Sequence, residues 1–206
     1  MYRHITIIVA LICFSSFVQS SSLQVEKVIS GLSIPWGMAF IDKYQLLVSE
    51  RNGHLLIIDI KSQKKDKLMD NPADLFAAGQ GGWLDIALSP FERNKVYVTY
   101  SRDTTSGPDT TLAVFDFDSN RAIKFKNLLT TTSFSNTSRH FGSRLTFSNE
   151  HIFMSIGDRG IRENGQSLTT HAGSILRLSP DGSPAKNNPF IDEPSLREEI
   201  YSFGHR

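Results

Sequence analysis

A histidine and an aspartate stand at the two ends of one predicted β-hairpin. His140 opens the first strand and Asp158 closes the second, because apolar residues alternate with polar or small ones on each side of a tight turn at Ser148–Asn149. In an antiparallel hairpin the start of one strand lies beside the end of the other, so the imidazole and the carboxylate are expected to meet at one rim of a sheet. A histidine beside a carboxylate can act as a general base whose ring is oriented by its partner.

The same aspartate also has a purely structural interpretation. It lies in Gly157-Asp158-Arg159-Gly160, a pattern that is common in turns. There the carboxylate accepts hydrogen bonds from nearby backbone amides and the glycines take a positive φ. The residues alone leave both interpretations open.

The first twenty residues are predicted to be a secretory signal peptide. Met1–Ser20 combines a basic start, an apolar run over Ile5–Val18 and small residues at the expected cleavage point. The apolar run is short for a membrane span, although an uncleaved anchor is the alternative. After cleavage the chain would have no membrane segment and no cysteine, because Cys13 lies within the signal peptide. These features favour a periplasmic or secreted protein.

The composition indicates a β protein without a nucleic-acid surface. The formal net charge is +1, which argues against a nucleic-acid partner, and Lys64–Lys67 is expected to be a solvated loop between strands. Fourteen phenylalanines, fourteen glycines and frequent β-branched residues occur without a long stretch of helical periodicity. This combination predicts an all-β fold.

Three similar segments recur along the chain at intervals of roughly fifty residues. Each contains three predicted strands, and such units form β-propeller blades, which pack face to face because each blade is apolar on both sides. The sequence therefore predicts about three blades, with Glu199–Arg206 as the start of a fourth. Since a propeller needs at least four blades to close, residues 21–206 are expected to be a partial propeller domain that is truncated at its C-terminus. The segments are Trp36–Ile58, Gly82–Phe115 and Gly142–Leu178.

Four other side chains are expected to be structural. Trp36 and Trp83 are predicted to pack between blades, as large aromatic residues in repeat units usually do. Arg144 is predicted to bond the backbone or a carboxylate between blades, and His171 to be a buried histidine with satisfied ring nitrogens.

A series of short motifs occurs in the order seen in the glucose/sorbosone dehydrogenase family, which the chain resembles from about residue 31 to residue 206. Members of this family are soluble aldose sugar dehydrogenases that depend on pyrroloquinoline quinone (PQQ), and they are six-bladed propellers exported to the periplasm. The motifs are Pro35-Trp36 with Ala39-Phe40, Gly79-Gln80-Gly81-Gly82-Trp83-Leu84-Asp85, His140-Phe141-Gly142-Ser143-Arg144-Leu145, Gly157-Asp158-Arg159-Gly160, Thr170-His171-Ala172-Gly173, Asn188-Pro189-Phe190 and Tyr201-Ser202-Phe203-Gly204-His205-Arg206.

The resemblance implies a role for each of four residues. His140 corresponds to the general base that takes the proton from the anomeric hydroxyl of the sugar while hydride passes to the quinone, and Asp158 corresponds to its carboxylate partner. Gln80 and Arg206 correspond to residues that line or contact the cofactor. The resemblance implies an aldose substrate and leaves the electron acceptor unidentified.

The resemblance also implies what this chain lacks. The family's calcium ligands and the basic residues that clamp the quinone carboxylates are expected beyond Arg206, so the chain alone is expected to be inactive. Two alternatives are kept. One is a non-catalytic propeller that binds a protein or a carbohydrate, because a fold does not determine a function. The other is a calcium-dependent hydrolase on a propeller, for which no set of acidic ligands can be assembled from the sequence.

Overall fold

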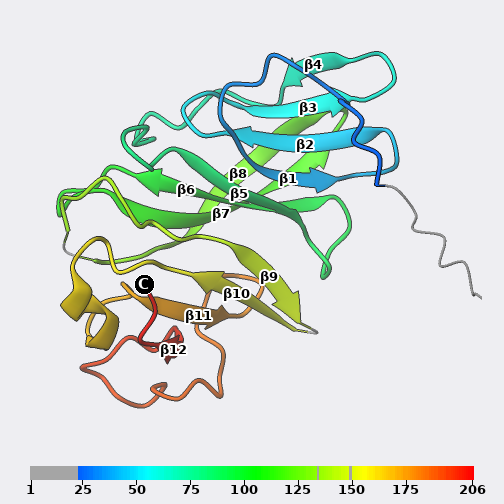
Figure 1. Ribbon diagram of the computed structural model, residues 1–206. Helices are drawn as coiled ribbons and strands as arrows, with labels where there is room; N and C mark the ends of the chain where they lie inside the picture. The colour runs from blue at the N-terminus through cyan, green and yellow to red at the C-terminus, as the bar shows by residue number, and fades with distance from the viewer. Residues whose placement is uncertain (1–22, 134, 149) are drawn as a thin grey trace, which may run out of the picture.

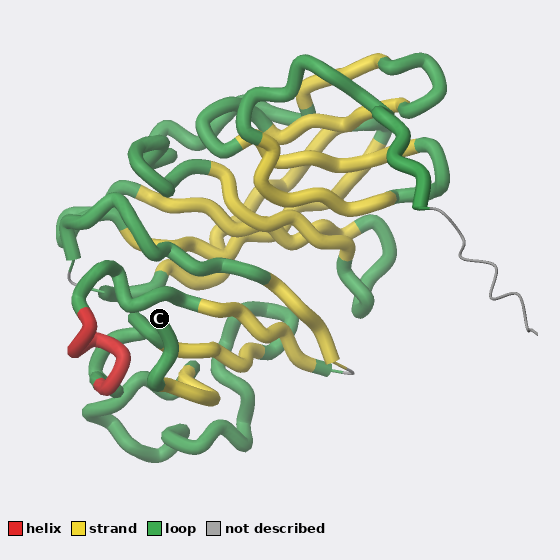
Figure 2. The backbone as a smooth tube through the Cα atoms, in the orientation of Figure 1, coloured by secondary structure: helices red, strands yellow, loops and turns green. Residues whose placement is uncertain are grey.

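The computed structural model describes residues 23–133, 135–148 and 150–206. The predicted signal peptide and Asn149 of the predicted turn lie outside these residues. The described part consists of strands and loops with one 3-10 helix, η1, at Arg162–Gln166 (Figure 2). The strands are β1 (Pro35–Phe40), β2 (Gln45–Glu50), β3 (Leu55–Asp59), β4 (Lys64–Lys67), β5 (Trp83–Leu88), β6 (Lys95–Arg102), β7 (Asp109–Asp118), β8 (Arg121–Thr130), β9 (Leu145–Ser148), β10 (His151–Ser155), β11 (Ser174–Leu178) and β12 (Ile200–Phe203).

The strands form three four-stranded antiparallel sheets, β1–β4, β5–β8 and β9–β12. Within each sheet, strands that follow one another in the chain are hydrogen-bonded neighbours. Figure 1 shows the sheets stacked one on the next, with β5–β8 in the middle. This arrangement confirms the all-β partial propeller. Among the described residues, no helix is both long and apolar enough to cross a lipid bilayer.

Two expectations about strands were wrong. Lys64–Lys67 forms the edge strand β4 rather than a loop, because the backbone of Leu56–Asp59 pairs with it while its lysines remain exposed. Ile200–Phe203, which was expected to begin a fourth blade, pairs with β11 and completes the third sheet. β4 and β12 are each the fourth strand of their sheet, and the exposed lysines of β4 give it little of the apolar alternation by which a strand is recognised.

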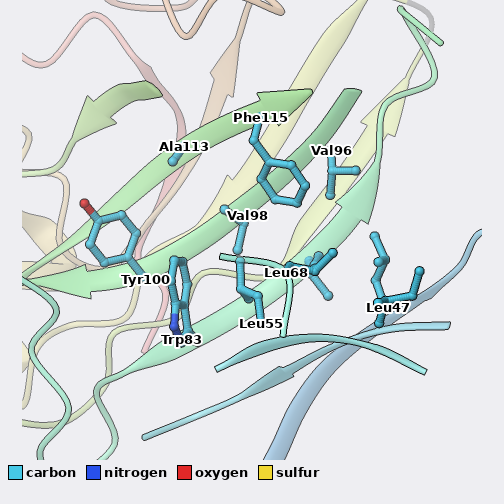
Figure 3. Packing of buried hydrophobic residues seen from close by; sticks show 11 residues of the cluster. Leu47, Leu55, Leu68, Trp83, Val96, Val98, Tyr100, Ala113 and Phe115 are labelled. Atoms are coloured by element: carbon cyan, nitrogen blue, oxygen red, sulfur yellow. The ribbon is translucent and has the colours of Figure 1, made fainter. Parts of the chain in front are cut away.

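The first and second sheets pack through a core of fully buried side chains (Figure 3). Leu47 and Leu55 from the first sheet meet Trp83, Val98 and Phe115 from the second, and each of these five has 0% of its surface exposed. Trp83 therefore packs between blades, as predicted.

The opposite face of the second sheet packs on the third sheet. Tyr97 and Leu112 lie one residue away in sequence from Val98 and Ala113 of the first core, so the alternation of a strand sends them to the other side. There they join buried residues of the third sheet, including Leu176. The middle sheet is thus apolar on both faces, which fixes the order of the three sheets.

Candidate functional site

His140 and Asp158 form a hydrogen-bonded pair in the structure. Nδ1 of His140 lies 2.6 Å from Oδ1 of Asp158, and the side chains are 24% and 10% exposed respectively. An ionised carboxylate only accepts hydrogen bonds, so the proton of the neutral imidazole is on Nδ1. The other ring nitrogen, Nε2, is then left with a lone pair that can accept a proton.

The pair meets at the rim predicted from the hairpin, although neither residue is in a strand. β9 starts at Leu145 and β10 ends at Ser155, and the two pair antiparallel with Met154 opposite Leu145. His140 and Asp158 lie in the loops just beyond these strand ends. The backbone of the loop before β9 is not extended at His140 and Gly142, because their φ values are 54° and 69°.

Asp158 remains ionised because of its hydrogen bonds. Burial by itself would raise the pKa of Asp158, but the hydrogen bonds from the His140 ring and from the backbone amide of Gly160, at 2.8 Å, hold that pKa below its ordinary value. The positive charge of Arg206 acts in the same direction, as does that of His140 whenever its ring is protonated. The carboxylate thus serves both interpretations proposed from the sequence, since it completes a turn and orients a histidine.

Gln80 supports the histidine loop through the backbone. The side-chain Oε1 of Gln80 accepts a hydrogen bond from the backbone amide of His140 at 2.8 Å. The backbone amide of Gln80 donates to the carbonyl of Ser138, also at 2.8 Å. Gln80 lies in the loop before β5, so this contact joins the loop of one sheet to the loop of the next. The structure therefore brings Gln80, His140 and Asp158 together.

Two adjoining cavities surround the pair, and His140 and Arg206 line both. The smaller, of about 450 Å³, is also lined by Trp36, Gln80 and Leu84. The larger, of about 1000 Å³, is also lined by Asp158, Glu163 and His205, and by two arginines besides Arg206. Arg206 is thus placed beside the other three predicted site residues.

Some lining residues were missed by the sequence analysis. Arg139 and Arg162 line the larger cavity; their positions directly before His140 and just after the Gly-Asp-Arg-Gly turn were the available signal. The prediction that Trp36 packs between blades was wrong, because it is 44% exposed and lines the smaller cavity. Gly37, its neighbour, faces the second sheet instead, where an added Cβ would lie 2.8 Å from the carbonyl of Leu84.

Two structural predictions are confirmed. Nη1 of Arg144 bonds the buried carboxylate of Asp85 at 2.8 Å and so connects the third sheet to the second. His171 is buried, its Nδ1 accepts from the amide of Thr132 at 3.0 Å, and its Nε2 lies 3.1 Å from Glu199. That hydrogen bond lowers the pKa of Glu199. Both ring nitrogens of His171 are satisfied, as expected for a structural histidine.

A metal site does not form from this part of the chain. Within residues 23–133, 135–148 and 150–206, no three side chains of His, Cys, Asp or Glu come together in a group that could hold an ion.

Comparisons with known proteins show what the chain is similar to. The sequence model of the family described as Glucose / Sorbosone dehydrogenase matches residues 32–206. The aldose sugar dehydrogenase YliI of Escherichia coli is 30% identical to the chain, with all of the chain and 58% of that protein aligned. The uncharacterized protein slr1608 of Synechocystis sp. is 35% identical over 89% of the chain and 50% of its own length.

A solved structure extends the similarity to three dimensions. The PQQ-bound form of the aldose sugar dehydrogenase of Streptomyces coelicolor superposes with a TM-score of 0.75 at 28% identity, covering 88% of this chain and 54% of that one. The chain spans about half the length of the curated relatives that it matches.

Proposed function

Because this chain belongs to the glucose/sorbosone dehydrogenase family, we propose that its protein oxidises aldose sugars at the anomeric carbon with PQQ as cofactor. The observation that carries the proposal is the His140–Asp158 pair, which opens on two cavities also lined by Arg206. The names of the relatives support the sugar substrate, and the PQQ-bound structure supports the cofactor.

In this proposal His140 is the general base. Its Nδ1 proton is bonded to Asp158, so Nε2 is free to take the proton of the anomeric hydroxyl. The imidazolium that results carries a positive charge next to an ionised carboxylate, and this attraction lowers the cost of the proton transfer. Gln80 fixes the backbone of the same residue and thereby limits where the ring can lie.

The residues present suit an anionic quinone. When bound, PQQ supplies the electron acceptor for the hydride of the sugar. The larger cavity contains Arg139, Arg162 and Arg206, and guanidinium groups bind carboxylates such as those of PQQ by charge-assisted hydrogen bonds. On this basis we assign Arg206 to the cofactor side of the site, and with it Gln80, which shares the lining of the smaller cavity with Arg206.

Calcium, location and dependence on other segments belong to the same proposal. Calcium would require ligands from the part of the relatives' length that this chain does not span, since the described residues hold no such group. We propose that the chain alone is inactive for this reason. The predicted signal peptide supports a periplasmic or secreted protein.

The test is dye reduction by the protein in its longest natural form, with PQQ, calcium and an aldose such as glucose. His140→Ala should lower kcat about 10²-fold to 10⁴-fold, as expected when a general base is removed. His151→Ala, at the opposite end of the hairpin, is the matched control and should retain activity.

The opposite result would be equally informative. A folded protein that neither binds PQQ nor reduces dye would contradict the proposed enzyme activity. It would favour a propeller that binds a protein or a carbohydrate. Equal activity in the two histidine variants would remove His140 from the reaction.

A further inference from the structure

We propose that Arg159 is a positioning residue. Its side chain fixes the backbone of the loop that carries His140, just before β9, and this loop is called the His140 loop below. Together with Asp158, Arg159 would hold the base from two sides, the carboxylate on the ring and the guanidinium on the main chain. This inference rests on the proposed function of His140 as a base.

The guanidinium of Arg159 is fully buried and binds backbone carbonyls. Nη2 donates to the carbonyls of Thr137 at 2.7 Å and Pro108 at 2.9 Å, and Nη1 donates to the carbonyl of Arg139. Arg139 immediately precedes His140 in the chain. The contacts therefore fix the segment that leads into the base, and also tie it to the residue before β7.

The residue that follows His140 is held by the same group. The guanidinium carbon of Arg159 lies 3.6 Å from the centre of the Phe141 ring, which is a cation–π contact. Phe141 is buried, so this ring provides a fixed surface. Arg159 thus contacts the residues on both sides of His140.

The loop needs such support because its backbone is strained. His140 has a φ of 54° and Arg159 itself a φ of 58°, in the left-handed region that non-glycine residues avoid. The hydroxyls of Ser135 and Thr137 both donate to the carbonyl of Arg159. The loop therefore holds Arg159 by its carbonyl while Arg159 holds the loop by its side chain.

Arginine suits this role better than lysine. Burial lowers the pKa of Arg159 to about 10, partly opposed by the nearby carboxylate of Asp109, so the group is still charged at neutral pH. The planar guanidinium of arginine can donate to three carbonyls at once. The compact ammonium of lysine cannot reach three acceptors spaced in this way. The positions of the three carbonyls, and not the positive charge alone, therefore favour arginine at this site.

Arg177, in β11 of the third sheet, provides a control for Arg159. It also donates to a backbone carbonyl, that of Asn187 at 2.6 Å, and lies 4.5 Å from the ring centre of Tyr201. Its other side-chain hydrogen bonds go to Oδ1 of Asn187 at 2.9 Å and Oδ1 of Asn188 at 2.8 Å, away from the loop that carries His140. Arg177→Met should therefore lose similar interactions without moving the base.

The experiment measures the His140 ring directly, without cofactor or sugar. The protein in its longest natural form is labelled with ¹⁵N-histidine, and exchange of the Nδ1 proton of His140 with water is followed by NMR, with His140→Gln used for assignment. In Arg159→Met we expect exchange to be faster by about tenfold or more, because the loop opens locally. In Arg177→Met it should stay within about twofold of wild type.

A kinetic measurement complements the NMR measurement. In PQQ-loaded protein, Arg159→Met should lower kcat by about 10²-fold with a much smaller change in KM, as expected for a misplaced base. Since the NMR readout needs no activity, failure of the proposed reaction would leave this inference testable.

Two results would overturn the inference. One is a folded Arg159→Met whose Nδ1 exchange equals that of wild type. The other is failure of both Arg159→Met and Arg159→Lys to fold while Arg177→Met folds, because Arg159 would then be a requirement of the whole domain and not a local support of the base.

Discussion

Two buried aspartates near the base respond to their surroundings in opposite directions. Burial raises the pKa of Asp109 above its ordinary value, despite hydrogen bonds from Ser133. Burial acts on Asp158 in the same direction, but the hydrogen bonds from His140 and Gly160 outweigh it and lower that pKa. Asp109 is the more deeply buried of the two, so burial prevails over the hydrogen bonds from Ser133 and the nearby charge of Arg159, whereas at Asp158 the hydrogen bonds from His140 and Gly160 prevail.

This contrast predicts opposite pH dependence for two variants. Ionised Asp158 contributes stability in full above pH 3.8, its unfolded value, and loses that contribution as the pH falls through its lower folded pKa. The contribution of Asp109 is present below pH 3.8 and is lost as the pH rises through its higher folded pKa. As the pH falls, the free energy of unfolding of wild type minus that of Asp158→Asn should shrink, and the same difference for Asp109→Asn should grow. Urea unfolding across the acid range measures both; slopes of the same sign would contradict the assignment.

Between elements, one carboxylate connects the second sheet to the third. Asp85 of β5 accepts from Nη1 of Arg144 at 2.8 Å and from the amide of Leu145 at 2.7 Å, and its side chain is 6% exposed. Because Leu145 begins β9, this contact helps to set where the hairpin that carries the site starts. The carboxylate therefore aligns the third sheet with the second.

Removing this connection should destabilise the protein. Asp85→Ala leaves the buried amide of Leu145 without an acceptor, at a cost of about 1–3 kcal/mol in the free energy of unfolding. Asp70→Ala is the control, because the side chain of Asp70 is 99% exposed and its ion pair with Lys67 lies at the surface. Thermal unfolding monitored by circular dichroism should show a lower midpoint for the first variant and almost no change for the second. Equal midpoints would mean that Asp85 does not connect the sheets.

The sequence predicted the first three strands of each sheet better than the fourth, and strand ends better than loops. Alternation in the β9–β10 hairpin was enough to bring His140 and Asp158 together. Alternation fails for β4, whose lysines are held as a strand only by pairing with β3. The left-handed backbone of His140 and the contacts of Arg159 could not be predicted, because they depend on carbonyls that come together only after the sheets pack.

For the molecule as a whole, the middle sheet couples the other two. Its two faces belong to different cores, so loss of packing against the third sheet should also weaken the first interface. Leu176 of the third sheet is fully buried, whereas Trp83 lies in the core between the first two sheets. The fluorescence of Trp83 can therefore report on a loss of packing in the third sheet, on the opposite face of its own sheet.

Leu176→Ala tests this coupling. In a Trp36→Phe background, the urea midpoint read from Trp83 fluorescence should fall, with a loss of about 2–5 kcal/mol typical of a leucine-sized cavity. The same shift should be seen by circular dichroism if the sheets unfold together. An unchanged Trp83 midpoint beside a lowered circular dichroism midpoint would mean that the sheets unfold separately.

The lysines of β4 bear on how this protein can be labelled. β4 is the last strand of its sheet, and within the described residues no strand pairs with its outer edge. Lys64, Lys65 and Lys67 are exposed along it, and Nζ of Lys65 also donates to the carbonyl of Gly31 at 2.8 Å. Ammonium groups on such an edge repel the strands of other molecules. Acylating reagents that attach dyes or solid supports to amines would neutralise this charge and expose a bare edge. Labelling through a cysteine introduced elsewhere would leave these ammonium groups charged, so they would still oppose strand pairing between molecules.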